Sequence, residues 1–262
     1  TVTVSDVETI TASAAADRVT LGDQATGATI DLAGGSDTLV LGDFVNTATV
    51  SNVEIITGGA SADTVTLATR ATAVVVDLAG GADTLVLGDF ANVLTASNVE
   101  TVTGGTSSDA LTLAAQATGS VIDLGAGTDT LTLGAFVNTV TVSNVETLTG
   151  GSTNDSVTLA AQATGATIDL GAGLDKLTLG AFVNTVTVSN VETVTGGSTN
   201  DTVVFGAAVT GATVDLGAGN DALVFAATGA TVTISNVETV TGSTATDVLT
   251  LGSQATGYTV DL

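Results

Sequence analysis

The residues in this chain that could do chemistry are aspartates, which recur at regular intervals beside glycine-rich turns. One set follows a Val or Ile at the end of an apolar stretch and consists of Asp31, Asp77, Asp123, Asp169 and Asp215. A second set lies within the turns and consists of Asp37, Asp63, Asp83, Asp109, Asp129, Asp155, Asp175, Asp201, Asp221 and Asp247. Carboxylates and backbone carbonyls in flexible turns are the ligands that Ca²⁺ prefers. Both sets are therefore candidate calcium ligands.

The charge balance of the chain also favours a bound cation. There are 27 acidic residues against three Lys and Arg, which gives a formal net charge of −24. Two carboxylates on neighbouring coils about 4.8 Å apart repel by about 3.5 kcal/mol at an effective dielectric constant of 20. Because the chain has no His and no Cys, a transition metal is a poor fit. A solvated acidic face that holds only water or sodium is the alternative interpretation.

Composition excludes several classes of function. A strongly acidic surface repels phosphate backbones and anionic lipids, so we expect no nucleic acid partner and no membrane insertion. No apolar run is long enough to span a bilayer, and no signal peptide is recognisable. With no His, one Tyr and three scattered cations, no acid, base and nucleophile come together in the sequence. We therefore expect that the protein is not an enzyme.

The elements that position the acids repeat with the same regularity. Six glutamates, each in a variant of S-N-V-E-T-V, are 46 residues apart: Glu8, Glu54, Glu100, Glu146, Glu192 and Glu238. The first set of aspartates falls halfway between them, which predicts coils of 23 residues paired into repeats of 46. After each turn acid, an x-U-x-U run, in which U is aliphatic or Phe, alternates as a half-buried strand does. About three such strands fit in each coil.

The predicted fold class is therefore all-β, a parallel β-solenoid of about eleven coils. We favour a right-handed β-helix, because the hexapeptide motif of a left-handed triangular helix is absent. A globular sandwich is the rival fold, but its strands would not repeat at a fixed spacing. The predicted β-helix occupies 1–262 as one continuous solenoid, which we interpret as a fragment of a longer repeat protein. A second column, formed by Asn52, Asn98, Asn144, Asn190 and Asn236, predicts an asparagine ladder at one corner.

The turns resemble a known family. Leu124–Thr132 and Gly150–Thr158 are similar to the nonapeptide G-G-x-G-x-D-x-U-x of the RTX, or haemolysin-type, repeats. The sequences that flank them are similar to those of long secreted bacterial surface proteins. The resemblance implies turn glycines, calcium between stacked turns, export by a type I system and an extracellular location. Because the coils are expected to hold 23 residues, we do not expect the narrow β-roll of that family. The glycines in question are Gly125, Gly127, Gly171, Gly173, Gly217 and Gly219.

These observations predict a structural, calcium-stabilised module of an extracellular bacterial surface protein, such as an adhesin stalk, a surface layer or a filament. Its expected partner is itself, end to end or laterally, and the sequence specifies no ligand. Outward pairs such as Thr64 and Thr66 leave an alternative open, in which a flat Thr-rich face binds ice or a glycan.

Overall fold

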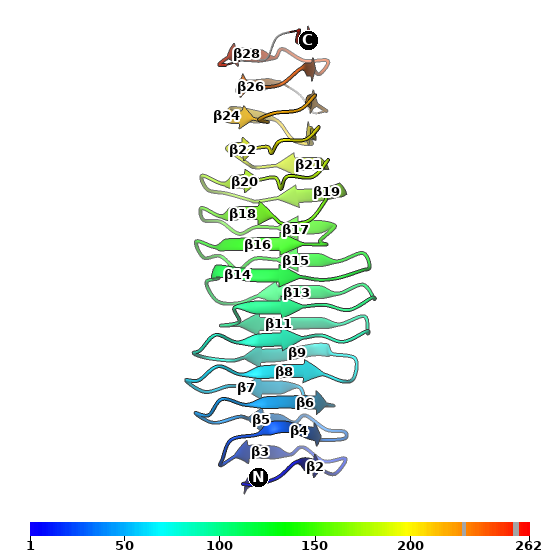
Figure 1. Cartoon of the computed structure of the whole chain (residues 1–262), viewed down its shortest axis with the longest axis vertical. Coiled ribbons are helices and arrows are strands. Elements are labelled where there is room, and N and C mark those ends of the chain that lie inside the picture. Colours follow the sequence, from blue (N-terminus) through cyan, green and yellow to red (C-terminus); the bar gives the residue numbers. More distant parts are fainter. Residues whose placement is uncertain (227–228, 254–256) are drawn as a thin grey trace. The chain divides into compact units, whose positions relative to one another are not determined.

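The fold consists of strands stacked in parallel. The computed structural model describes residues 1–226, 229–253 and 257–262, and it divides into two compact units, Thr1–Gly134 and Ala135–Leu262. Each unit is a parallel β-solenoid in which successive strands enter two sheets alternately (Figure 1). The predicted all-β parallel solenoid is confirmed, whereas one continuous solenoid over 1–262 stays a prediction. In the described ranges, no helix meets the length and hydropathy that a membrane span requires.

Odd-numbered strands form one sheet of each unit and even-numbered strands form the other, here called the odd sheet and the even sheet. In the first unit the odd sheet consists of β1 (Val2–Val4), β3 (Arg18–Leu21), β5 (Thr38–Val40), β7 (Ile55–Thr57), β9 (Thr72–Asp77), β11 (Val93–Ser97), β13 (Ala110–Leu113) and β15 (Thr130–Thr132). Its even sheet consists of β2 (Thr9–Thr11), β4 (Thr26–Asp31), β6 (Thr47–Ser51), β8 (Thr64–Leu67), β10 (Thr84–Val86), β12 (Thr101–Thr103) and β14 (Thr118–Asp123).

The second unit repeats this arrangement. Its odd sheet consists of β17 (Thr147–Thr149), β19 (Thr164–Asp169), β21 (Thr185–Ser189), β23 (Thr202–Phe205), β25 (Ala222–Phe225), β27 (Thr239–Thr241) and β29 (Thr259–Asp261). Its even sheet consists of β16 (Thr139–Ser143), β18 (Ser156–Leu159), β20 (Lys176–Thr178), β22 (Thr193–Thr195), β24 (Val209–Asp215), β26 (Ala230–Ser235) and β28 (Val248–Leu251).

The coils are shorter than the sequence predicts. Asn46 and Asp63 occupy equivalent positions on neighbouring coils 17 residues apart, and Asp63 and Asp83 do so 20 residues apart. The strand register gives the same two spacings, since Leu39 pairs with Ile56, 17 residues later, and Ile56 pairs with Val76, 20 residues later. Each coil has two strands rather than three. The predicted spacing of 23 residues is therefore wrong, and shorter coils mean more of them than the eleven predicted.

Five strands in each repeat explain this difference. Strand β6 begins at Thr47 and β11 begins at Val93, so β6 to β10 make up one repeat of 46 residues. Because each coil takes two strands, a repeat of five strands covers two and a half coils. Equivalent segments of successive repeats consequently lie in opposite sheets, as β6 and β11 do. Two coils per repeat was the simpler inference, but an odd number of strands excludes it.

The core lies between the two sheets of each unit. In the first unit Val19, Leu39, Ile56 and Val76 stack along the odd sheet and are at most 2% exposed. In the second unit the rings of Phe205 and Phe225 stack with their centroids 6.0 Å apart. Several outward positions beside these residues are Thr, such as Thr20, Thr38 and Thr57, and Thr suits an exposed strand. The predicted inward aliphatic columns are confirmed.

Candidate functional site: acid ladders at the edges of the coils

The turn acids form hydrogen-bonded ladders that run from coil to coil. Asn46, Asp63, Asp83 and Glu100 come from the turns that follow β5, β7, β9 and β11, which lie at the same edge of the first unit. The backbone N–H of Asn46 donates to Asp63 Oδ1 over 3.0 Å, and that of Asp63 donates to Asp83 Oδ1 over 2.7 Å. The N–H of Asp83 in turn donates to Glu100 Oε2 over 2.8 Å. We call this series an acid ladder.

Other repeats carry the same ladder. The bonded series are Asp17–Asp37–Glu54 and Asn92–Asp109–Asp129 in the first unit, and Asn138–Asp155–Asp175–Glu192, Asn184–Asp201–Asp221–Glu238 and Ala230–Asp247 in the second. Because a repeat covers two and a half coils, the ladder through Asn92 lies at the opposite edge from the ladder through Asn46. We call an aspartate six residues after a strand-end aspartate a short-turn aspartate (Asp37, Asp83, Asp129, Asp175 and Asp221), and one nine residues after a repeat glutamate a long-turn aspartate (Asp17, Asp63, Asp109, Asp155 and Asp201). The structure brings each short-turn aspartate together with a long-turn aspartate.

Each complete ladder begins at a buried asparagine. The side chain of Asn46 is 1% exposed, and its Oδ1 accepts the N–H of Ala25 over 2.9 Å. Its Nδ2 donates to Asp63 Oδ1 over 2.9 Å and to the carbonyl of Phe44 over 2.8 Å. These asparagines were not among the predicted site residues, although they recur every 46 positions, two residues after each turn Phe. They are Asn46, Asn92, Asn138 and Asn184.

The first set of aspartates lies outside the ladders, at the ends of strands. Asp31 Oδ1 accepts the N–H of Ala33 over 2.9 Å and the Nδ2 of Asn52 over 2.7 Å. These bonds, the one from Asn52 foremost, lower the pKa of Asp31 from its usual value. Asp77, Asp169 and Asp215 repeat both contacts, and Asp123 Oδ1 accepts the N–H of Gly125.

The asparagines predicted to stack at a corner do not form a ladder with one another. Asn52 instead pairs with an aspartate 21 residues earlier in the chain. Its φ of 52° lies in the left-handed region, which Asn tolerates better than most residues. Asn98, the next member of the series, is two and a half coils away and belongs to the other edge. This prediction was wrong because the repeat alternates between the two edges.

The turn acids differ in whether their second carboxylate oxygen has a hydrogen-bond partner. The Oδ2 of Asp63 accepts the N–H of Gly59 over 3.4 Å, and Asp155, Asp201 and Asp247 have an equivalent bond. Buried Oδ2 atoms without a hydrogen-bond partner belong to Asp37, Asp83, Asp109, Asp175 and Asp221. Burial raises the pKa of Asp83, Asp175 and Asp221 to about 6, and the neighbouring Asp and Glu carboxylates raise it further.

The turn glycines allow the coils to stack closely. Gly125 has a φ of 83°, and a Cβ at this position would overlap the carbonyl oxygen of Gly105 on the neighbouring coil. Gly171 and Gly217 are placed in the same way against Gly151 and Gly197. Gly127, Gly173 and Gly219 have φ between 153° and 158° and also face the backbone of the neighbouring turn. These glycines therefore bring successive turns into backbone contact.

A calcium ion takes six to eight oxygen ligands, and the oxygen atoms of the ladders can be compared with this requirement. The Oδ1 atom of each ladder aspartate is already within hydrogen-bond distance of a backbone nitrogen, 2.7 Å for Asp83. Within the part of the chain that the structure describes, no three His, Cys, Asp or Glu side chains surround one point. As arranged, these residues form a hydrogen-bonded ladder and do not fit a calcium cage. Calcium binding stays a prediction from the charge pattern and the resemblance.

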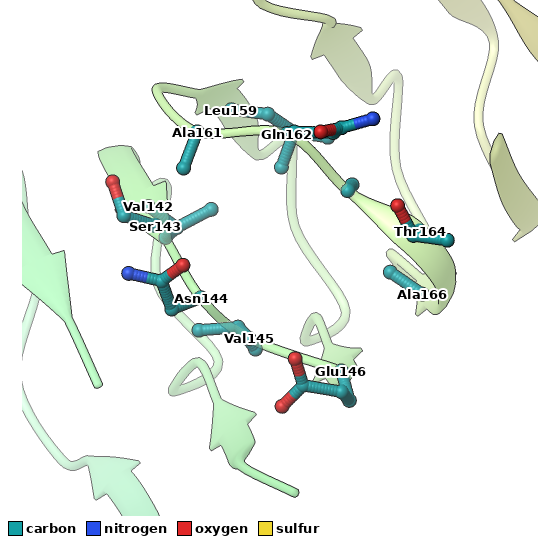
Figure 2. A pocket seen from close by; sticks show the side chains of 11 residues that line it. Val142, Ser143, Asn144, Val145, Glu146, Leu159, Ala161, Gln162, Thr164 and Ala166 are labelled. Carbon is teal, nitrogen blue, oxygen red and sulfur yellow. The ribbon is translucent and has the colours of Figure 1, made fainter. Parts of the chain in front are cut away.

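A small surface hollow accompanies the ladders. In Figure 2, Ser143, Asn144 and Glu146 lie on one segment and Gln162 and Thr164 on the segment that faces it. An equivalent hollow in the first unit is lined by residues from Val50 to Val74. Ala163 and Ala71 line these hollows, and their backbone N–H groups donate to the Oδ1 atoms of Asn184 and Asn92, the residues at which two of the ladders begin.

Comparisons with known proteins do not place the chain in a family. Searches against protein-family models, curated proteins and solved structures found no match.

Proposed function

We propose that the chain is a structural repeat module of an extracellular bacterial surface protein, such as an adhesin stalk, a surface layer or a filament. The observation that carries this proposal is the use made of the recurring polar side chains. In each ladder they bind backbone N–H groups of the neighbouring coil, as Asp63 and Asp83 do. Residues that recur in every repeat thus serve the stacking of coils.

The distribution of these groups favours a structural role over catalysis. An active site needs one constellation of acid, base or nucleophile in a pocket. Here the carboxylates are spread evenly over successive coils, and the side chains around the hollow in Figure 2 include no His, Cys, Lys or Arg. The proposal therefore assigns no catalytic step to the chain.

The resemblance to RTX repeats supports the proposed location. It implies export by a type I system and a place at the cell surface, where the module would associate with further copies end to end or laterally. The net charge of −24 suits an exposed, soluble surface and disfavours nucleic acid and anionic lipid as partners. Stacked repeats without a distinct site are also typical of spacers and lattice elements.

Antibodies raised against residues 1–262 test the location. Applied to intact cells that express the parent protein, they should label the surface, and external protease should remove the label. An antibody against a cytosolic enzyme is the control for cell integrity. Labelling that appears only after lysis would refute the proposal.

A second candidate function has a specific observation in its favour. In the even sheet of the first unit, register places Thr47, Thr64, Thr84 and Thr101 in one outward column. The positively charged Arg18, which interrupts the threonine pattern in the sequence, lies in the odd sheet instead. A regular, uncharged face of hydroxyl and methyl groups would suit ice or a neutral glycan.

Ice recrystallisation assays and pull-down with insoluble glycans test this second function. Thr84→Lys should abolish binding, because it introduces a charge at the centre of the column. Thr38→Lys, which makes the same change in the odd sheet, is the matched control. If the unmodified protein binds neither ice nor glycan, the second function is refuted.

A further inference from the structure

We propose that copies of the chain associate side by side, with residues 43–45 of one copy seated in the first-unit hollow of the next. We call residues 43–45 the projecting turn. This inference rests on the proposed function, because it specifies how the lateral contacts of that module form. An exposed apolar pair and a hollow with a positive charge at its rim carry it, and both lie in the first unit.

The projecting turn, which follows β5, presents two apolar side chains to solvent on a fixed backbone. Phe44 and Val45 are 38% and 53% exposed. The carbonyl of Phe44 accepts the Nδ2 of Asn46 over 2.8 Å. The carbonyl of Val45 accepts the Nε2 of Gln24 over 2.7 Å. Because hydrogen bonds already hold this backbone, the turn loses little further freedom when a partner binds.

The hollow lies between the turns that follow β6 and β8. Those turns follow even-numbered strands and the projecting turn follows an odd-numbered one, so the hollow and the turn lie at opposite edges of the unit. Val53 and Leu67, which are at most 5% exposed, contribute apolar surface to the hollow. Its volume is about 210 Å³, and a cavity of about 150 Å³ already holds benzene. The hollow is therefore large enough for a phenyl ring.

Charge complementarity identifies this hollow as the partner of the projecting turn. Arg70 lines the hollow and is exposed, and its Nε donates to the carbonyl of Ala91 over 2.9 Å. None of the described carboxylates forms an ion pair with it. Asp43 is also exposed and precedes Phe44, so a turn that docks in the hollow brings a carboxylate to this guanidinium.

Glu54 also lines the hollow, and its charge would oppose an approaching acid. Its Oε2, however, already accepts the backbone N–H of Asp37 over 2.7 Å, within a ladder. The guanidinium of Arg70 has no such acid partner among the described residues. Arg70 is therefore the charge that a docking turn would meet.

The size of the contact indicates that the occupant is a second copy of the chain. Two partly exposed side chains bury far less than the about 800 Å² per partner of a stable interface, so one such contact is weak. A second copy carries both the turn and the hollow, at opposite edges, so each copy in a row makes two contacts. Phe136 and Val137, 43% and 53% exposed, and the hollow in Figure 2 repeat the arrangement in the second unit and can add further contacts.

Sedimentation velocity at increasing protein concentration, in about 0.15 M NaCl with EGTA, tests this proposal. The weight-average sedimentation coefficient of the wild type should rise with concentration. Arg70→Glu and Asp43→Arg should each lower it toward the monomer value, because like charges then meet at the contact. An equimolar mixture of the two variants should associate again, since every contact in an alternating row then joins opposite charges.

Further variants separate the contact from other causes. Arg70→Gln keeps a donor for the Ala91 carbonyl, as Gln24 does for Val45, and should weaken association up to about fivefold through loss of the ion pair. Phe44→Ala should weaken it at least about tenfold. Val121→Thr, which changes a residue of β14 that is 47% exposed, is the control and should leave association unchanged.

Several outcomes would overturn the proposal. They are a wild type that stays monomeric at every concentration, a mixture that associates no more than its two components do, and association that Phe44→Ala leaves unchanged. Circular dichroism shows whether each variant folds. If charge reversal prevents folding, Arg70→Gln and Asp43→Ala provide the test, and Ala135 stands at the position equivalent to Asp43. Surface labelling of cells together with a monomeric chain would refute this contact and leave the proposed location standing.

Discussion

Replacing Asn46 by Ala tests whether the ladders hold the coils together. The substitution removes the Oδ1 acceptor of the buried Ala25 N–H and the Nδ2 bonds to Asp63 Oδ1 and to the carbonyls of Phe44 and Leu41. A net hydrogen bond contributes about 0.5–1.5 kcal/mol, and one to a charged group about 1.5–3 kcal/mol. Because water that enters near the edge can replace some of these hydrogen bonds, we expect a loss of about 3–5 kcal/mol in the free energy of unfolding.

Urea unfolding followed by circular dichroism measures this loss, and Asn52→Gly is its matched control. Asn52 is exposed, has a φ of 52° that Gly adopts readily, and gives up one bond to Asp31. We expect the control to change stability by less than about 1 kcal/mol, because its bond is exposed to solvent. If Asn46→Ala costs no more than Asn52→Gly, the ladders are not a main source of stability.

Three further changes probe the core, the turn contacts and calcium. Leu85→Ala should cost about 2–5 kcal/mol in urea unfolding, because Leu85 is 0% exposed, and a loss under 1 kcal/mol would contradict the proposed core. Gly104→Ala should lower the melting temperature, because its Cβ would overlap the Leu124 carbonyl oxygen and prevent normal stacking. Gly34→Ala is the control, since its Cβ would meet no atom within 4 Å. Equal melting temperatures of the two variants would contradict the proposed turn contacts. Thermal melts at pH 7.5 with EGTA and with excess Ca²⁺ should coincide if the ladders, and not calcium, hold the turns. A higher melting temperature with Ca²⁺ would support the calcium prediction instead.

The strand pattern was predictable because it depends on local chemistry. Alternation such as Thr130-Leu131-Thr132-Leu133 places one side chain in the core and the next outside, whichever sheet the strand joins. Leu131 and Leu133 are 0% and 2% exposed, as this pattern predicts. The spacing of 46 residues then requires neighbouring copies to stack, which led to a parallel solenoid.

The number of strands in a coil was not predictable in the same way. Both sheets present aliphatic side chains inward, so the same x-U-x-U segment fits either of them. A strand can therefore move to the other sheet in the next repeat without exposing an apolar residue. The sequence repeats every 46 residues in either case, and periodicity alone does not separate two coils from two and a half.

The candidate site was also predictable from the sequence only in part. From the sequence alone came the recurrence of the acids and their place in glycine-rich turns. Only the tertiary structure decided that Asp63 and Asp83 are neighbours 20 residues apart, that Asn46 begins their ladder, and that Asp83 Oδ2 lacks a partner. The physical reason is that a residue's type and period are properties of the chain, whereas its hydrogen-bond partners depend on how far the chain advances in each coil.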